Sequence, residues 1–213
     1  MLFTRNLLLV LVWSLIIGLS LYFFLDNVVA FLFGYRGRSF GTTLFNNQLW
    51  VVLHLVGGTM CLLTGPLQFW PSLRRKYTAF HRATGKVYMA GVGLIGLSSL
   101  RLSLVSYCVP CRISLFLLTL FVLFTTWAAW YTIRNKNIKA HRQFMVRSYI
   151  CVLAFVAVRI DDVLPLNFLF GTIEDPTFNR TVNEYFFSFV PLLVAEVFLT
   201  WIPALRFKKK MIA

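Results

Sequence analysis

The stretch ISLFLLTLFVLFTTWAAWYTI, residues 113–133, decides the fold because it holds no charged side chain. At a rise of about 1.5 Å per residue, a helix of this length crosses the roughly 30 Å of hydrocarbon in a bilayer. Apolar stretches of similar length occur on both sides of it. We therefore expect about six membrane spans, at residues 7–25, 49–69, 82–105, 113–133, 144–164 and 185–205.

The composition agrees with a protein whose solvent is lipid. Hydrophobic residues make up 59% of the chain, charged residues only 13%, and the mean hydropathy is +0.75, which exceeds the values of water-soluble domains. Backbone groups in lipid must bond to one another, so such spans are helices. We predict an all-α, polytopic transmembrane helical bundle that forms one domain over residues 1–213.

The charged residues are unevenly distributed between the two sides. Most of the 21 Lys and Arg residues fall at the start, around the second and fourth connections and in the tail, and the positive-inside rule assigns that side to the cytoplasm. Both termini are then cytoplasmic. The net charge of +14 is better suited to anionic membrane lipid than to nucleic acid, because the basic residues flank apolar spans. The opposite side collects Asp26, Asp161, Asp162, Glu174, Asp175 and Glu184.

A repeated His-Arg dipeptide begins the third and fifth spans. His81 and His141 therefore share one depth at the cytoplasmic face, and two facing imidazoles are what the iron of a b-type haem binds. Gly85, one turn after His81, would leave room for the macrocycle. The alternative is that these residues anchor helices to lipid headgroups. The candidate haem-binding residues are His81, His141, Arg82, Arg142, Gly85 and Arg147.

A second polar group is expected toward the outer face. His54 lies in the outer part of the second span, too far from His81 and His141 to share an iron, and it faces a quinone, a proton path or an open haem position. Glu196 lies deep in the last span, where a carboxylate carries protons or pairs with an arginine. The alternative is that the outer residues are water-exposed helix ends. The candidate quinone or substrate site comprises His54, Arg101, Arg159, Asp161 with its neighbour Asp162, and Glu196.

Two of the four cysteines lie in the outer connection between the third and fourth spans. Cys108 and Cys111 form a C-x-x-C motif, which can be a disulfide, a redox pair that passes electrons to quinone, or two free thiols. Redox catalysis ranks third, because such chemistry normally uses a second pair in another outer loop. Cys61 and Cys151 lie within spans and are expected to be packing residues.

Several linked motifs resemble those of the bacterial predicted membrane proteins known as domain of unknown function 2306. The resemblance runs from about His54 to Arg159 and implies a multi-spanning protein of the bacterial inner membrane. More distantly, the histidines at helix starts resemble those of two-haem cytochrome b bundles. The motifs are His54 with Gly58, Gly65-Pro66-Leu67-Gln68-Phe69, Phe80-His81-Arg82 with Gly85-Lys86-Val87-Tyr88, and His141-Arg142 with Met145, Arg147-Ser148-Tyr149 and Arg159.

The sequence thus favours a membrane oxidoreductase component that is linked to haem b or quinone and works with a redox partner protein. Two other classes stay open. One is a small proton-coupled transporter or channel subunit, in which His54, Glu196 and the aspartates carry protons or solute. The other is a membrane partner protein without chemistry of its own.

Overall fold

A computed structural model describes residues 2–29, 33, 48–158, 171 and 173–205. The described part is helical and contains no strand, which confirms the predicted all-α class. Short α5 (Pro71–Lys76) and the π-helical segments η1 (Phe24–Val29) and η3 (Val197–Trp201) accompany six long helices. These are α1 (Leu2–Phe23), α4 (Gln48–Phe69), α6 (Thr78–Leu104), α7 (Cys111–Arg134), α8 (Ile138–Ala157) and α10 (Pro176–Glu196).

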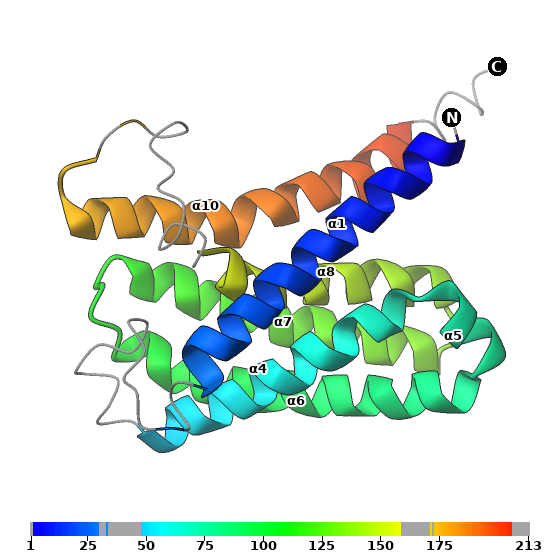
Figure 1. Cartoon of the computed structure of the whole chain (residues 1–213), viewed down its shortest axis with the longest axis horizontal. Helices are drawn as coiled ribbons and strands as arrows, with labels where there is room; N and C mark the ends of the chain where they lie inside the picture. The colour runs from blue at the N-terminus through cyan, green and yellow to red at the C-terminus, as the bar shows by residue number, and fades with distance from the viewer. Residues whose placement is uncertain (1, 30–32, 34–47, 159–170, 172, 206–213) are drawn as a thin grey trace.

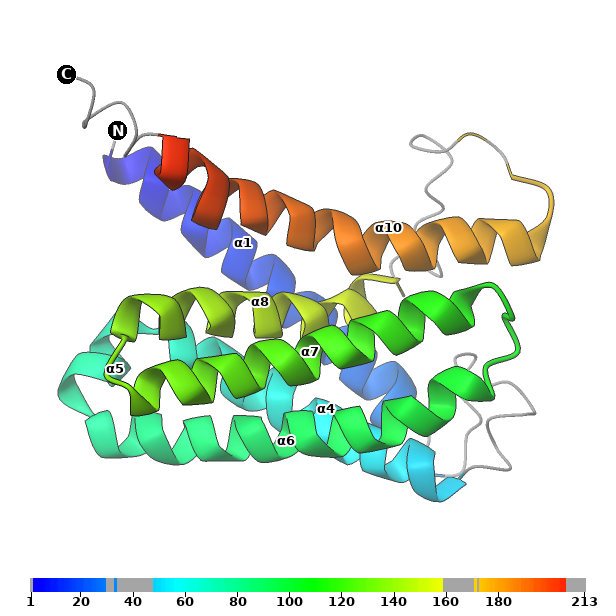
Figure 2. The ribbon, with the colours of Figure 1, turned by 180° about the vertical axis from the view of Figure 1, so that it is seen from behind.

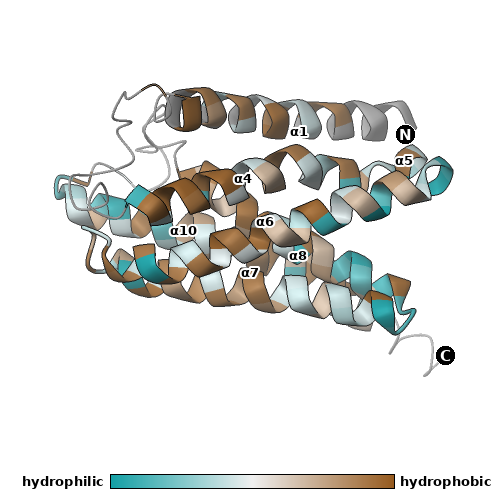
Figure 3. Cartoon of the chain, turned by 90° about the horizontal axis from the view of Figure 1, so that it is seen from below, coloured by the Kyte–Doolittle hydropathy of each residue, from teal (hydrophilic) through white to brown (hydrophobic). Residues whose placement is uncertain are grey.

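Four helical segments of the described part are long and apolar enough to cross a membrane: Gln48–Phe69, Thr78–Leu104, Cys111–Arg134 and Pro176–Leu205. Helix α8 covers residues 144–157 of the fifth predicted span, whose residues 159–164 lie outside the described part, and it is not among these four segments. In α1 only a shorter apolar segment, Trp13–Tyr22, stands out. Length and hydropathy therefore support four of the six predicted spans. Figure 3, coloured by hydropathy, shows hydrophobic residues along the middle of the helices and hydrophilic residues toward their ends.

Helices α4, α6, α7 and α8 lie side by side, and α10 packs against α7 and α8 (Figures 1 and 2). Helix α1 crosses this group obliquely and touches α8. We call the end that carries α5, His81 and His141 the basic end, and the end that carries Cys108 and Cys111 the disulfide end. Helix α1 begins at the basic end, and η3 ends on the same side (Figure 1).

The closest helix contact joins α4 to α6. A Cβ atom added to Gly57 would lie 2.6 Å from the carbonyl oxygen of Gly91, and one added to Gly91 would lie 2.9 Å from the carbonyl oxygen of Gly57. Helices in lipid gain little from the hydrophobic effect, so small residues that let backbones approach are their usual means of packing. This contact sets the spacing of the two helices that carry His54 and His81.

Candidate functional site

A cavity of about 130 Å³ lies inside the bundle toward the disulfide end. Helices α4, α6, α7 and α8 form its walls, and residues at the start of α10 line it as well. Most of the lining is aliphatic or aromatic. The polar side chains that line it are His54, Thr59, Ser99, Ser103, Ser106, Thr119, Arg180 and Glu184.

His54 is the imidazole of this wall. Its Nδ1 atom lies 2.9 Å from the Oγ atom of Ser99 on α6, and its ring centroid lies 4.9 Å from that of Phe155 on α8. Gly58 follows one helical turn later on the same face, and a Cβ atom there would meet nothing within 4 Å. The helix surface next to the imidazole is therefore open to the cavity.

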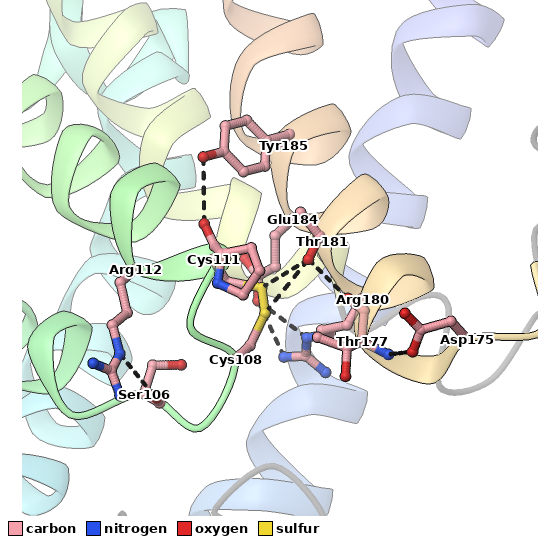
Figure 4. Close-up of a disulfide and its surroundings, with 11 residues drawn as sticks. Ser106, Cys108, Cys111, Arg112, Asp175, Thr177, Arg180, Thr181, Glu184 and Tyr185 are labelled. Atoms are coloured by element: carbon pink, nitrogen blue, oxygen red, sulfur yellow. Dashed lines mark hydrogen bonds and ion pairs between the residues drawn. A yellow bond between two sulfur atoms is a disulfide. The ribbon is translucent and has the colours of Figure 1, made fainter.

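A disulfide joins Cys108 to Cys111, with the Cα atoms 5.3 Å apart (Figure 4). The residues are 3% and 1% exposed, and Cys108 lines the cavity. The Oγ1 atom of Thr181 on α10 lies 3.7 Å from Sγ of Cys108 and 3.9 Å from Sγ of Cys111. Tyr185 donates a hydrogen bond to the carbonyl of Pro110 at 3.4 Å. The loop is thereby tied to α10.

An ion pair on α10 borders the same cavity. Nη2 of Arg180 lies 3.1 Å from Oε1 of Glu184, one turn further along the helix, and Glu184 is only 4% exposed. Figure 4 shows both side chains beside the disulfide. The cavity wall therefore combines an imidazole, a disulfide and a paired carboxylate, each from a different part of the sequence.

The predicted outer site is only partly brought together. Arg101 is exposed on α6 and does not line the cavity. Arg159, Asp161 and Asp162 lie outside the described residues. Glu196 lies at the basic end, away from His54, because α10 runs from the disulfide end to the basic end (Figure 1).

Glu196 pairs with Arg147 of α8, one of the two roles expected for it. Nε of Arg147 contacts Oε1 of Glu196, and Nη2 lies 2.9 Å from Oε2. The Thr200 hydroxyl donates to the same carboxylate at 2.8 Å and accepts from Nη2 of Arg147 at 2.7 Å. Arg147, which the sequence offered as a candidate haem-binding residue, is thus paired with Glu196 in the structure.

The basic end brings the repeated histidines together. His141 and His81 are near enough for a charge on one to act on the other, and Arg74 and Arg82 surround His81. Nδ1 of His141 lies 2.8 Å from the carbonyl oxygen of Ala129. Nδ1 of His81 is buried and has no hydrogen-bond partner among the described residues. The fifth member of the group, Arg142, is exposed.

Arg74 lies close to other cations at the basic end. It lies on α5, outside the spans, and its pKa is lowered by burial and by the nearby cations Arg142 and Arg75. Each added cation raises the cost of charging the others. The basic end is therefore a region where anionic groups are stabilised.

Gly85 does not provide the open surface that a haem beside His81 needs. A Cβ atom at Gly85 would lie 3.2 Å from Oε1 of Gln68, so the amide of Gln68 occupies that space. Its Nε2 atom donates to the Thr84 hydroxyl at 2.8 Å. Gly65 is similarly covered, because a Cβ atom there would collide with the ring of Tyr149.

A chain of buried hydroxyl groups crosses the core between the cavity and the basic end. The Tyr88 hydroxyl lies 2.9 Å from Oγ of Ser148, which lies 2.6 Å from Oγ1 of Thr126. Tyr88 follows His81-Arg82 on α6 and Tyr149 follows His141-Arg142 on α8, and their ring centroids are 6.4 Å apart. The two halves of the repeat therefore face each other.

Sequence reasoning missed Ser99, Thr119, and the Arg180–Glu184 pair as parts of one site. The signal on α6 was a pair of small polar residues one turn apart in an apolar helix, Ser99 and Ser103, followed by Ser106 just after the helix. Nothing in the local pattern of α10 indicated that Arg180 and Glu184 reach the cavity.

The several long apolar helices and the polar sites that they enclose define a multi-helix membrane protein. The chain belongs to the DUF2306 family of predicted membrane proteins, whose match spans residues 51–200. That range includes all the cavity-lining residues except Val28, and both histidines of the basic end. No curated protein and no solved structure matches the chain.

Proposed function

We propose that the protein binds a membrane quinone in the cavity and takes part in quinone-linked electron transfer. The observation that carries the proposal is the His54 imidazole in the wall of a largely apolar cavity inside the bundle. A quinone is a flat apolar ring with two carbonyl acceptors, and it arrives from the bilayer. Sites for such molecules combine apolar walls with a few polar groups that set the orientation.

The environment of His54 supports a binding role. An ionisable side chain inside a membrane helix is costly, and such residues mark functional sites by default. Ser99 and Phe155 hold the ring in one orientation, and Gly58 leaves the adjacent backbone open. A flat ring can therefore lie against α4 with a carbonyl toward the imidazole.

Filling the cavity from Gly58 tests the proposal. Purified protein in lipid nanodiscs is titrated with decylubiquinone, and Gly58→Leu is expected to weaken binding at least about tenfold, because the leucine occupies the space beside His54. Gly93→Leu is the matched control. A Cβ atom at Gly93 also meets nothing within 4 Å, but Gly93 is exposed and does not line the cavity. Equal affinities in the two variants would contradict the proposal.

A b-type haem between His81 and His141 is a second candidate, and the hydrogen bond of His141 favours it. Histidines that bind metal usually donate their other N–H to a carbonyl, as Nδ1 of His141 can to Ala129, which leaves Nε2 for the iron. Bound haem would supply one-electron transfer. Arg82 and Arg142 are suited to the propionates, but the space at Gly85 is filled by Gln68.

An absorption spectrum separates the two candidates. A reduced-minus-oxidised spectrum of the purified protein shows haem bands if the second candidate holds, and His81→Ala and His141→Ala abolish them. His54→Ala should leave those bands unchanged, because His54 lies in the other region. Folded protein without extractable porphyrin excludes the haem and leaves the quinone proposal standing.

We also infer that both termini face the cytoplasm of a bacterial cell and that the protein lies in its inner membrane. Two features support this orientation. The basic residues Arg74, Arg75, Lys76 and Arg82 gather at one end. The disulfide lies at the other, which suits an oxidising compartment.

A further inference from the structure

We propose that the Cys108–Cys111 disulfide is a redox-active pair whose dithiol form reduces the quinone in the cavity. This inference rests on the proposed quinone site. Beyond the quinone site, we assign the electron donor to the quinone and the chemical class of the partner that supplies the electrons, a dithiol protein.

The position of the disulfide carries the inference. Cys108 and His54 line the same cavity, although they come from the loop after α6 and from the first third of α4. The cysteines are 3% and 1% exposed, so water has little access to the sulfur atoms, whereas a molecule in the cavity meets Cys108. A sulfur pair that faces a ligand site is placed for electron exchange with that ligand.

Stabilisation of the fold explains this disulfide poorly. A disulfide stabilises mainly by restricting the unfolded chain, and the effect grows with the length of the loop that it closes. Here the two cysteines are only three positions apart. The loop is already held by the hydrogen bond of Tyr185 to Pro110 and by the contact with Thr181. The bridge therefore adds little as a staple.

The side chains around the pair suit a dithiol that loses protons. The Thr181 hydroxyl lies within 4 Å of both sulfur atoms, where it can donate to a thiolate. Arg180 brings a cation to the same wall, and positive charge favours the thiolate form. Glu184, paired with Arg180, places a carboxylate in the same cavity wall.

The proposed reaction balances in two steps. First, a dithiol on a partner protein opens the disulfide by thiol–disulfide exchange, so the partner's two thiols become a disulfide and Cys108 and Cys111 become thiols. Second, the Cys108–Cys111 bond forms again, and the two electrons and two protons of the thiols pass to the quinone, which becomes a quinol. The neighbouring residues Tyr107 and Val109 are 55% and 62% exposed, so a partner can dock on the loop, and the loop must then move to admit the partner's thiol to the buried sulfur atoms.

The test follows the thiols and the quinone together. Protein in nanodiscs is reduced with dithiothreitol, desalted without oxygen and mixed with decylubiquinone. Free thiols are then counted by alkylation and mass spectrometry, and quinol is measured by absorbance. We expect one quinol for each disulfide that forms. Cys108→Ser and Cys111→Ser should abolish quinol formation, whereas Cys61→Ala should not, because Cys61 is buried in the core and does not line the cavity.

Gly58→Leu shows whether the electrons pass through the cavity. We expect oxidation of its dithiol by quinone to slow at least tenfold, while diamide, a small oxidant that needs no quinone site, still closes the pair. Equal rates of oxidation by quinone in Gly58→Leu and in the unchanged protein would overturn the inference. A disulfide that dithiothreitol reduces only after the protein is denatured would also overturn it.

Failure of the inference and failure of the proposed function give different results. If decylubiquinone binds and the thiols stay reduced, the inference is overturned and the quinone site stands. If decylubiquinone neither binds nor oxidises the pair, the proposed function fails, and the inference fails with it.

Discussion

The Nδ1 atom of His54 lies 2.9 Å from the Oγ atom of Ser99, and this contact joins α4 to α6 at the wall of the cavity. The two residues are 45 positions apart in the sequence. Their contact depends on the close approach of Gly57 and Gly91 on the same two helices. The glycine contact therefore packs α4 against α6 and also brings the His54 imidazole next to Ser99.

Removing the Ser99 hydroxyl should weaken quinone binding. In Ser99→Ala the His54 ring loses the hydrogen bond that orients it, and a neutral hydrogen bond contributes about 0.5–1.5 kcal/mol, so we expect affinity for decylubiquinone to fall about two- to tenfold. Ser98→Ala is the control, since Ser98 donates to the Leu94 carbonyl and does not line the cavity. An equal loss in both variants would show that the effect is structural.

Removing the hydroxyl group should lower the stability of the protein at Tyr88 but not at Tyr149. Tyr88→Phe breaks the buried contact with Ser148, and we expect the free energy of unfolding to fall by about 1 kcal/mol. The Tyr149 hydroxyl is buried and has no partner among the described residues, so Tyr149→Phe should be neutral or stabilising. Unfolding in mixed micelles measures both. The prediction is wrong if Tyr149→Phe destabilises more than Tyr88→Phe.

The stability of the protein should fall more when one partner of the Arg147–Glu196 pair is replaced than when both are replaced. Glu196→Gln leaves Arg147 largely buried without its counter-ion. Because Glu196 is 32% exposed, we expect a loss of about 1–3 kcal/mol rather than the larger value of a fully buried pair. Replacing both partners by Met and Leu removes the uncompensated charge, so stability should largely return. Thermal unfolding in detergent tests this. A double variant that is less stable than either single variant would contradict it.

Replacing Glu196 also tests proton transport as a competing function. A transporter that relies on Glu196 should lose proton flux in liposomes when Glu196→Gln is introduced. We expect no such loss, because Glu196 is already held by Arg147 and Thr200 at the end away from His54. Flux that vanishes with Glu196 would favour the transporter instead of the quinone site.

Single cysteines can test the orientation of the chain. Ser72 of α5 and Glu174, before α10, are both exposed and lie at opposite ends. In a background that retains Cys108 and Cys111, a membrane-impermeant maleimide added to intact bacterial cells should label Glu174→Cys and not Ser72→Cys. Lysed cells should label both. The reverse pattern would place the basic end outside.

Much of the fold could be predicted from the sequence because lipid imposes local rules. An apolar run such as residues 113–133 must be helical, and α7 covers Cys111–Arg134. For the first and fifth predicted spans, the length and hydropathy of the described residues give no such support, and residues 159–164 of the fifth lie outside the described part. The sequence left the C-x-x-C motif open between a disulfide and free thiols, with redox catalysis third, and the structure joins the two cysteines in a disulfide.

The sequence by itself determined the helices, their polar ends and the level at which His81 and His141 stand. Only the tertiary structure decided which residues meet. It placed Gln68 over Gly85, paired Arg147 with Glu196, and put Cys108 and His54 in one cavity. The physical reason is that hydropathy sets the depth of a residue in the membrane, whereas side-chain packing sets the rotation of each helix and its neighbours.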